Sequence, residues 1–463
     1  MEMNIPQLVG FLCTLVLLIG LSIYSGKKAK GTSFTGNKNS NATIVAGMII
    51  GTIVGGSSTI GTAQLAYHYG FSAWWFTLGA GLGCLLLGLF FVKPFRQQNS
   101  LTVTGMITEA YGPQVGLAAT LLSSIGIFIN IIAQIMAATT IIAIFFPNLS
   151  LLSMAIVAAL LMISYVIFGG VTGAGMVGVL KTVLLYMASV GGGCLALYLT
   201  GGFSSLYENP ILEHSKYFHL FARGVGTDLG AVLSLLVGVL STQTYIQAIL
   251  VAKNDREAMK GAFISAAFVP PIGIGGIMIG LFMRVNYPDL ASAKYAFPVF
   301  VMNHMPSVLA GVVIAGLLIV AVGTGAGLAL GISTIIQRDL IDRFFKERTE
   351  KIGKQTIARI LIILVLMTAS LFATGKLGDL ILGFSFMSMG LRGAVLFLPL
   401  MCILFLKVKI KANYAMASVI MGPVAVLLGN FIIHGFDPLF IGLGLNTIIM
   451  MIGLYKSKNL DRR

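Results

Sequence analysis

Charged residues are scarce in this chain: only 10% of its 463 residues are Asp, Glu, Lys or Arg, whereas 57% are hydrophobic. A soluble globular protein carries about 25% charged residues, so most of this chain must face something other than water. Long uncharged apolar runs recur from end to end, and each run of roughly 20 residues can cross a ~30 Å hydrocarbon core as a helix. Because the runs are continuous rather than alternating, they favour helices over a membrane barrel.

Paired cysteines and catalytic motifs are also missing. The four cysteines lie within apolar runs without paired spacing, so neither a disulfide framework nor a metal site is indicated (Cys13, Cys84, Cys194 and Cys402). The sequence has no His-Glu-x-x-His motif, no aspartate pair within a span and no nucleotide-binding loop, which argues against an enzyme and against an organic cofactor. No span carries the repeated polar residues of a channel. The first span lacks a basic leader and a cleavage site, so we expect it to be retained.

The net charge of +15 is distributed in a way that argues against nucleic-acid binding. We predict about thirteen spans, near 6–25, 42–64, 72–92, 115–146, 150–168, 176–199, 228–251, 261–284, 307–337, 356–374, 379–406, 412–434 and 437–455. Alternate loops then hold most of the Lys and Arg residues, and such loops are cytoplasmic in membrane proteins. We therefore expect a multi-pass protein of the cell (inner) membrane, with its N-terminus outside and its C-terminus in the cytoplasm.

Three spans contain residues that interrupt helices. Glycines cluster in the second span (Gly51, Gly55, Gly56 and Gly61) and in the ninth (Gly316, Gly323, Gly325 and Gly327), and the seventh has a polar run from Ser241 to Thr244. Broken helices in matching halves are typical of transporters built from inverted repeats. Small residues also allow helices to pack closely, so the glycines alone leave both interpretations open.

Several motifs resemble, in order, those of the sodium:solute symporter family. They are Phe34-Thr-Gly-Asn-Lys38, Tyr165-Val-Ile-Phe-Gly-Gly170, the stretch from Gln243 through Gln247, Lys253, Glu257 and Ala258 to Gly261, and Leu309-Ala-Gly311 leading to Ser333-Thr-Ile335 and Asp339. The resemblance covers roughly residues 6–406. It implies an all-α integral membrane protein with a LeuT-like 5+5 inverted repeat and flanking helices. The implied division is an extra helix in 1–41, repeats in 42–199 and 227–406, and two further helices in 407–463.

The resemblance also implies a sodium site between the first and eighth core helices. Carbonyls of Gly51 and Val54 would serve on one side, and Val320, Gly323 and Thr324 would serve on the other. This sequence departs from the family pattern at two places. Gly323 stands where a serine is expected, and Val177-Gly-Val-Leu-Lys181 replaces the usual Thr-Asp-x-x-Gln. One hydroxyl and one acidic residue are therefore missing, and a lysine is present.

Lys181 and Arg392 are the deep cations of the predicted spans, and an ionisable residue within a membrane is a functional candidate by default. The Lys181 ammonium could stand in for the missing sodium, or load and release a proton, because burial disfavours the charged form of a lysine. Alternatively, Lys181 could snorkel to the cytoplasmic interface or contact the solute. Arg392 could cap helix carbonyls near a bend, or bind an anion.

By resemblance, the substrate site should lie between the first and sixth core helices, with polar residues of the third facing it. The candidates are Ser57, Ser58, Gln64, Gln134, Thr242, Gln243 and Gln247, with Asn130 beside them. Free N–H groups after the Gly55-Gly56 break would add a positive dipole end. Because no acidic residue lies in mid-span and Lys181 and Arg392 are cationic, the electrostatic potential of the site favours a small carboxylate or amino acid as the solute. We therefore expect symport coupled to sodium, or to protons if Lys181 replaces the ion; the alternative is an uncoupled facilitator or solute sensor.

Overall fold

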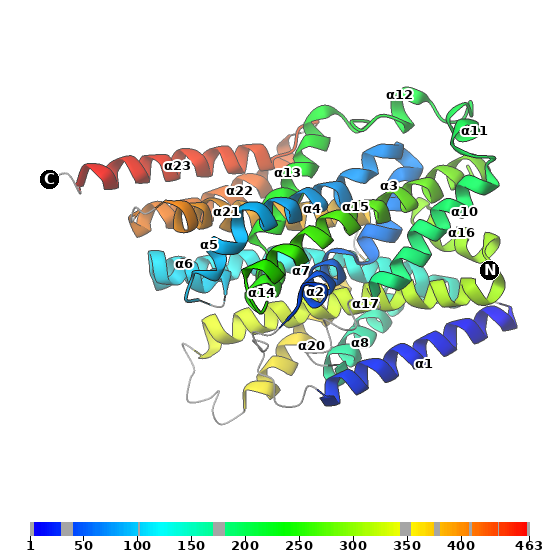
Figure 1. Cartoon of the computed structure of the whole chain (residues 1–463), viewed down its shortest axis with the longest axis horizontal. Helices are drawn as coiled ribbons and strands as arrows, with labels where there is room; N and C mark the ends of the chain where they lie inside the picture. The colour runs from blue at the N-terminus through cyan, green and yellow to red at the C-terminus, as the bar shows by residue number, and fades with distance from the viewer. Residues whose placement is uncertain are drawn as a thin grey trace.

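The computed structural model describes residues 4–28, 40–100, 102–169, 181–342, 353–374, 380–406, 410–433 and 435–460. Regular secondary structure in these residues is helical, and the only strand-like pairing among them is the single bridge between Ser40 and Ala252. The long helices lie side by side along the long axis of the molecule, and α1 (Ile5–Lys28) begins at the end opposite to that where α23 (Leu439–Leu460) finishes (Figure 1).

The first half of the chain forms helices that are interrupted by short irregular turns. Its long elements are α2 (Ala42–Ile53), α3 (Thr62–Tyr69), α4 (Trp75–Leu86), α5 (Val92–Arg96), α6 (Val103–Tyr111), α7 (Pro113–Phe145), α8 (Leu151–Gly169) and α10 (Gly192–Leu199). The π-helical turns η1 (Ser57–Gly61), η3 (Leu87–Phe91) and η4 (Tyr186–Gly191) and the 3-10 turn η2 (Gly70–Trp74) join some of them. The helical segment Lys181–Leu199 contains η4 and α10.

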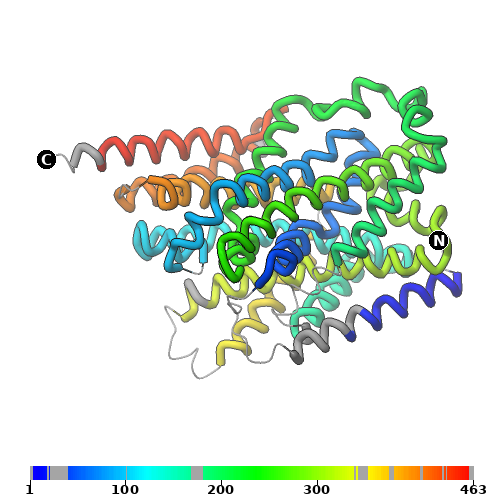
Figure 2. The backbone as a smooth tube through the Cα atoms, in the orientation of Figure 1, coloured from blue at the N-terminus to red at the C-terminus, as the bar shows by residue number. Residues whose placement is uncertain are grey.

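The second half begins after two short helices, α11 (Phe203–Tyr207) and α12 (His214–Tyr217). Its helices are α13 (Val225–Ser241), α14 (Gln243–Leu250), α15 (Asp255–Asn286), α16 (Ala296–His304), α17 (Ser307–Ile336), α20 (Lys354–Phe372), α21 (Ile381–Phe405), α22 (Ala412–Ile432) and α23, with the turns η5 (Ala293–Tyr295) and η6 (Gln337–Ile341). In the backbone trace, α7 and α17 lie within the bundle, and α1 and α23 lie along two of its edges (Figure 2).

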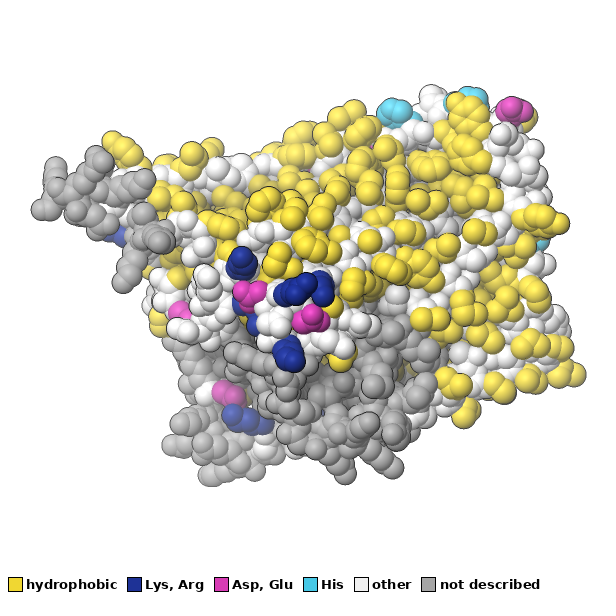
Figure 3. Space-filling view, viewed as in Figure 1, with side chains coloured by type: hydrophobic (Ala, Val, Ile, Leu, Met, Phe, Trp, Pro, Cys, Tyr) yellow, Lys and Arg dark blue, Asp and Glu magenta, His cyan; other side chains and the backbone are white. Residues whose placement is uncertain are grey.

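Apolar length makes this a multi-pass membrane protein. Among the described residues, nine helices are long and apolar enough to cross a membrane, and a tenth is added if α13 and α14 form one bent span. Shorter apolar helices occupy Ile5–Leu17, Ala42–Ile53 and Leu151–Ile167. Each predicted span overlaps one of these elements, but the count of thirteen stays a prediction. Figure 3 shows hydrophobic side chains covering much of one face, with a small charged group over α5, α14 and α15.

The charged group fixes the ends of two helices. Arg96 donates to the carbonyls of Ile249 (2.8 Å) and Ala252 (3.0 Å) at the end of α14, and it pairs with Asp255 at 2.6 Å. Glu257 accepts the backbone N–H of Ala42 at 2.7 Å, which caps the start of α2. Asp255 and Glu257 of the 243–261 motif thus have a structural role, since they tie Arg96 and the start of α2 to the start of α15.

Two helices are broken near their middles, one in each half of the chain. After α2 the backbone becomes extended at Val54 (φ −88°, ψ 100°), and the chain resumes as η1 and α3. The second break is at Thr242 (φ −87°, ψ 123°), where α13 and α14 meet at a bend of 46°. The predicted polar break in the seventh span is therefore present.

In the ninth span, whose glycines left a break and close packing both open, the structure has a continuous helix. α17 runs without a break through Gly316, Gly323, Gly325 and Gly327. A Cβ at Gly325 would lie 2.5 Å from the Met162 sulfur, so this glycine allows α8 to approach α17. Gly325 therefore serves close packing, and the helix's own hydrogen bonds continue past all four glycines.

Close helix packing through glycine also gives a stability prediction. A Cβ at Gly275 of α15 would lie 2.1 Å from the carbonyl oxygen of Ser189, a backbone atom that cannot move aside cheaply. We expect Gly275→Ala to destabilise the protein by about 1–3 kcal/mol, the usual cost of overpacking, measured as thermal unfolding in detergent. Gly327→Ala is the matched control, because nothing lies within 4 Å of its Cβ position. Equal unfolding temperatures for the two variants would contradict this packing.

Candidate functional site

The ammonium of Lys181 lies between the break after α2 and the middle of α17. Its Nζ donates to the carbonyl oxygen of Gly51 at 3.0 Å and to the Thr324 hydroxyl at 3.1 Å. Thr324 Oγ1 also lies 3.4 Å from the Gly51 oxygen, so the two acceptors adjoin each other. Lys181 is 4% exposed. A snorkelling lysine would keep its ammonium at the surface, and this one lies buried between two helices.

The missing serine at position 323 leaves room for this ammonium. A Cβ built on Gly323 would lie 3.4 Å from Lys181 Nζ and 3.4 Å from the Tyr165 hydroxyl. Val54, at the break after α2, and Val320 of α17 are fully buried. Of the positions mapped from the family, Gly51 and Thr324 meet across these two elements, and an ion-binding role for the set stays a prediction. The Lys181 ammonium nitrogen contacts the Gly51 and Thr324 oxygens, and oxygens of this kind are the ligands that sodium, a hard cation, prefers.

A second polar group surrounds Gln134 of α7, next to the break after α2. Gln134 Oε1 accepts the N–H of Gly56 at 2.8 Å, and its Nε2 donates to Ser57 Oγ at 2.7 Å and to Asn130 Oδ1 at 3.3 Å. Ser58 bonds within the turn, accepting the N–H of Gly55 and donating to its carbonyl, both at 2.9 Å. The prediction of free N–H groups at this break is thus wrong for Gly55 and Gly56, since side chains of the protein already cap both.

The polar group continues along one face of α21. Ser385 donates to Asn130 at 3.2 Å, Ser388 donates to the Gly126 carbonyl at 2.6 Å, and Arg392 donates to Thr242 Oγ1 at 2.9 Å. We call this group the polar column; it comprises Ser57, Asn130, Gln134, Thr242, Ser385, Ser388 and Arg392. All seven side chains are buried. The column links η1, α7 and α21 to the break between α13 and α14.

Three predicted substrate residues lie apart from the column. Gln64 Oε1 accepts the N–H of Ile381 at 3.1 Å and so caps the start of α21. Gln243 Oε1 accepts the N–H of Val103 at 2.8 Å, at the start of α6. Gln247 is half-buried on α14. These contacts position helix ends, and a solute-binding role for the three glutamines stays a prediction.

Ser385 and Ser388 were missed in the sequence, although a signal for them exists. They lie four and seven residues before Arg392 in an otherwise apolar span, and residues with this spacing share one helix face. Arg392 was singled out, but its serine neighbours were not read together with it. Gly126 completes the contact, because a Cβ there would lie 2.8 Å from Arg392 Cγ.

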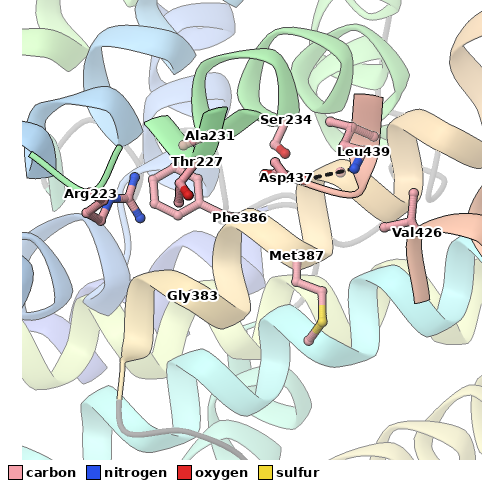
Figure 4. Close-up of a pocket in the computed structure, with 11 residues that line it drawn as sticks. Arg223, Thr227, Ala231, Ser234, Gly383, Phe386, Met387, Val426, Asp437 and Leu439 are labelled. Atoms are coloured by element: carbon pink, nitrogen blue, oxygen red, sulfur yellow. Dashed lines mark hydrogen bonds between the residues drawn. The ribbon is translucent and has the colours of Figure 1, made fainter. Parts of the chain in front are cut away.

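A cavity of about 150 Å³ lies between α13, α21 and the ends of α22 and α23. In Figure 4 the Arg223 guanidinium lies beside the Phe386 ring, and their separation is 5.2 Å to the ring centroid. Arg223 pairs with the buried Asp228 at 2.6 Å. Asp437 accepts the N–H of Leu439 at 2.9 Å, and burial raises the pKa of its carboxyl. The arginine of this cavity therefore has an acidic partner within the protein.

The two deep cations lack such a partner. Four ion pairs occur among the described residues, and neither Lys181 nor Arg392 takes part in any of them. No group of three or more His, Cys, Asp or Glu residues able to hold a metal ion occurs in the same part of the chain. The chemistry of the site is therefore that of two buried cations among hydroxyls, amides and carbonyls.

Comparison with known proteins gives the family. The profile of the Sodium:solute symporter family matches residues 34–422. The human (Homo sapiens) High affinity choline transporter 1 is 21% identical over 455 residues, covering 88% of this chain and 74% of its own length.

Two solved structures show the fold. A Na+-coupled sialic acid symporter in a substrate-bound, outward-open state superposes with a TM-score of 0.78 at 17% identity, covering 98% of both chains. A transporter of the nucleobase-cation-symport-1 family, in a closed conformation, gives 0.59 at 14% identity over 91% of this chain and 94% of its own. Both are transporters of the LeuT fold, and neither is an enzyme. Membership of the family implies a membrane protein that moves a small solute with Na+ as coupling ion. This chain belongs to the sodium:solute symporter family.

Proposed function

We propose that this chain is a secondary active transporter of a small carboxylate or amino acid in which the Lys181 ammonium takes the place of a sodium ion. The observation that carries the proposal is the pair of bonds from Lys181 Nζ to the Gly51 carbonyl and the Thr324 hydroxyl. These two oxygens belong to the positions mapped for sodium. An ammonium and a sodium ion cannot share this space, so sodium can bind here only when Lys181 leaves.

The coupling ion at this position is then a proton, and here the proposal departs from the Na+ coupling that the family implies. With the protein open to the outside, Lys181 takes a proton from water and its ammonium joins the broken α2 to α17, as sodium would. With the protein open to the cytoplasm, an N–H bond of the ammonium breaks and the proton passes to water. Since Lys181 has only uncharged acceptors here, keeping the ammonium buried without a counter-charge is costly. Release of the proton removes the energetic cost of the buried charge. It also weakens the contact between α2 and α17 that the ammonium makes.

The substrate class follows from the charge of the site. Arg392 places positive charge within the polar column and Lys181 places it beside the break after α2, and an anionic or zwitterionic solute offsets that charge. The human relative is named as a transporter of choline. Choline is a cation, which Lys181 and Arg392 would repel. The sialic acid of the structural neighbour carries a carboxylate, but at 17% identity that likeness concerns the fold. The charge inventory of this chain therefore supports the carboxylate class.

The remaining expectations are proposals of the same kind. We propose repeats at 42–199 and 227–406, because each begins with a broken helix, α2–η1 and α13–α14 respectively. We also propose that the protein lies in the cell (inner) membrane, and the alternation of basic loops supports an N-terminus outside. A second candidate is an uncoupled facilitator. The observation that favours it is the contact of Lys181 Nζ with Gly51 and Thr324, because a lysine that kept its proton there would exclude a coupling ion permanently.

Uptake into proteoliposomes under separately imposed gradients tests the proposed coupling. An inward proton gradient should drive accumulation of a labelled carboxylate, and an inward sodium gradient at equal pH on both sides should not. Uptake that only equilibrates under both gradients would support the facilitator instead. Accumulation driven by sodium at equal pH would contradict the assignment of Lys181 as the built-in cation.

A further inference from the structure

Arg392 is the most unusual buried group of the polar column. Its side chain is 1% exposed and is the largest of the fully buried side chains among the described residues. Nη1 donates to Thr242 Oγ1 at 2.9 Å, Nη2 donates to Ser388 Oγ at 3.0 Å, and Nε donates to the Ser388 carbonyl at 3.2 Å. The remaining contact of Nη2 is with the Met389 sulfur at 3.1 Å. Every one of these acceptors is uncharged.

A purely structural arginine would be expected to have a different environment. Buried charges in proteins are paired or bind a ligand, because an unpaired one forfeits its solvation. Arg223 of the same protein shows the usual solution, since it pairs with the buried Asp228. If Arg392 only capped carbonyls, a neutral donor such as glutamine or asparagine would do so at much lower cost. The positive charge itself therefore needs a reason.

We propose that Arg392 binds the carboxylate of the transported solute, and this inference rests on the proposed function. A guanidinium offers parallel N–H donors that match the two oxygens of a carboxylate, which an ammonium cannot do. The carboxylate takes the place of Thr242 on Nη1 and of Met389 on Nη2. Ser388 keeps the arginine aligned through Nε and its carbonyl.

The position of Arg392 links solute binding to the moving part of the site. Thr242 is the extended residue at which α13 and α14 bend. Its hydroxyl also donates to the Gly238 carbonyl at 2.6 Å, in the last turn of α13. When a carboxylate replaces Thr242 on the guanidinium, the bond that joins α21 to the break is released. Solute binding thereby exchanges a contact within the protein for a contact with the solute.

The test compares carboxylates with their amides on the purified full-length protein. L-Lactate, pyruvate and L-proline are paired with lactamide, pyruvamide and L-prolinamide, with glucose and choline added, and binding is measured as thermal stabilisation. We expect at least one carboxylate to stabilise the protein and its amide to fail. Stabilisation by the neutral or cationic probes alone, or by no carboxylate of the panel, would overturn the proposal.

Variants then assign the effect to Arg392. R392Q should weaken binding of the stabilising carboxylate by about 30-fold or more, as loss of a buried charge-assisted pair does, and R392K should weaken it less. R359Q is the matched control, because Arg359 is exposed on α20. If R392Q unfolds, the comparison of each acid with its amide on the wild-type protein still tests whether the site requires a carboxylate. Unchanged carboxylate affinity in a folded R392Q would contradict the assignment.

The outcomes separate this inference from the proposed coupling. If uptake is independent of the proton gradient but requires both the carboxylate and Arg392, proton coupling is contradicted and the proposed binding site at Arg392 is supported. If a proton gradient drives uptake of a neutral solute and R392Q leaves that uptake unchanged, proton coupling is supported and the proposed binding site at Arg392 is contradicted.

Discussion

Replacing Lys181 by methionine is expected to abolish proton-driven accumulation while leaving solute exchange across the membrane in place. Methionine is close to lysine in length and fills the same space, but it has no ammonium to donate to Gly51 and Thr324. Accumulation is possible only if the loaded and empty states differ by a proton, and Lys181→Met removes the group that carries it. The internal concentration of a labelled carboxylate should then only reach the external one.

Counterflow in proteoliposomes separates coupling from binding. Vesicles preloaded with unlabelled carboxylate should still take up labelled solute through Lys181→Met, with less dependence on pH than the wild type shows. Lys260→Met is the matched control, because this lysine is half exposed and its pairing with Glu257 is a surface contact at 3.8 Å. Proton-driven accumulation by Lys181→Met at the level of the wild type would show that another group carries the proton.

The all-helical, membrane-spanning fold was predictable from the sequence because apolar length is a local property of the chain, whereas the exact number of spans stays a prediction. The break at Thr242 was predictable for the same reason, since four consecutive polar residues interrupt an apolar run. The glycines of α17 were ambiguous, because glycine permits both a break and a close contact. Only the neighbouring helix decides between these, and at Gly325 the Met162 side chain of α8 is that neighbour.

The candidate site was predictable only in part. Lys181, Gly51 and Thr324 are far apart in the chain, and the family pattern was needed to bring them to one place. The direction of a long side chain cannot be read from the sequence, and Gln243 illustrates this: it follows the break at Thr242 but turns to the start of α6. The capping of Gly56 by Gln134 was hidden in the same way, because it joins elements 78 residues apart.

The double variant Lys181→Ala with Gly323→Ser is expected to make transport depend on sodium. Alanine withdraws the ammonium and frees the Gly51 carbonyl and the Thr324 hydroxyl. Serine restores the hydroxyl that the family pattern has at this position, and its Cβ would lie 3.4 Å from where Nζ now stands. Three oxygens then surround a space that a cation occupied, which suits sodium. We expect sodium to stimulate uptake by about tenfold or more, equivalent to about 1.4 kcal/mol of binding free energy.

Each single change should fail for its own reason, and this makes the double variant informative. With Gly323→Ser alone, the ammonium still fills the space, so sodium cannot enter. With Lys181→Ala alone, the space is open but lacks one hydroxyl, so sodium binding stays weak. Uptake measured at fixed pH against sodium concentration should therefore show a response well above the sum of the single variants. An additive or absent response would mean that Lys181 does not stand where sodium would bind. If only the double variant gains a sodium requirement, Lys181 and the missing serine at position 323 act together. The lysine ammonium then replaces the sodium ion, and the glycine leaves space for it.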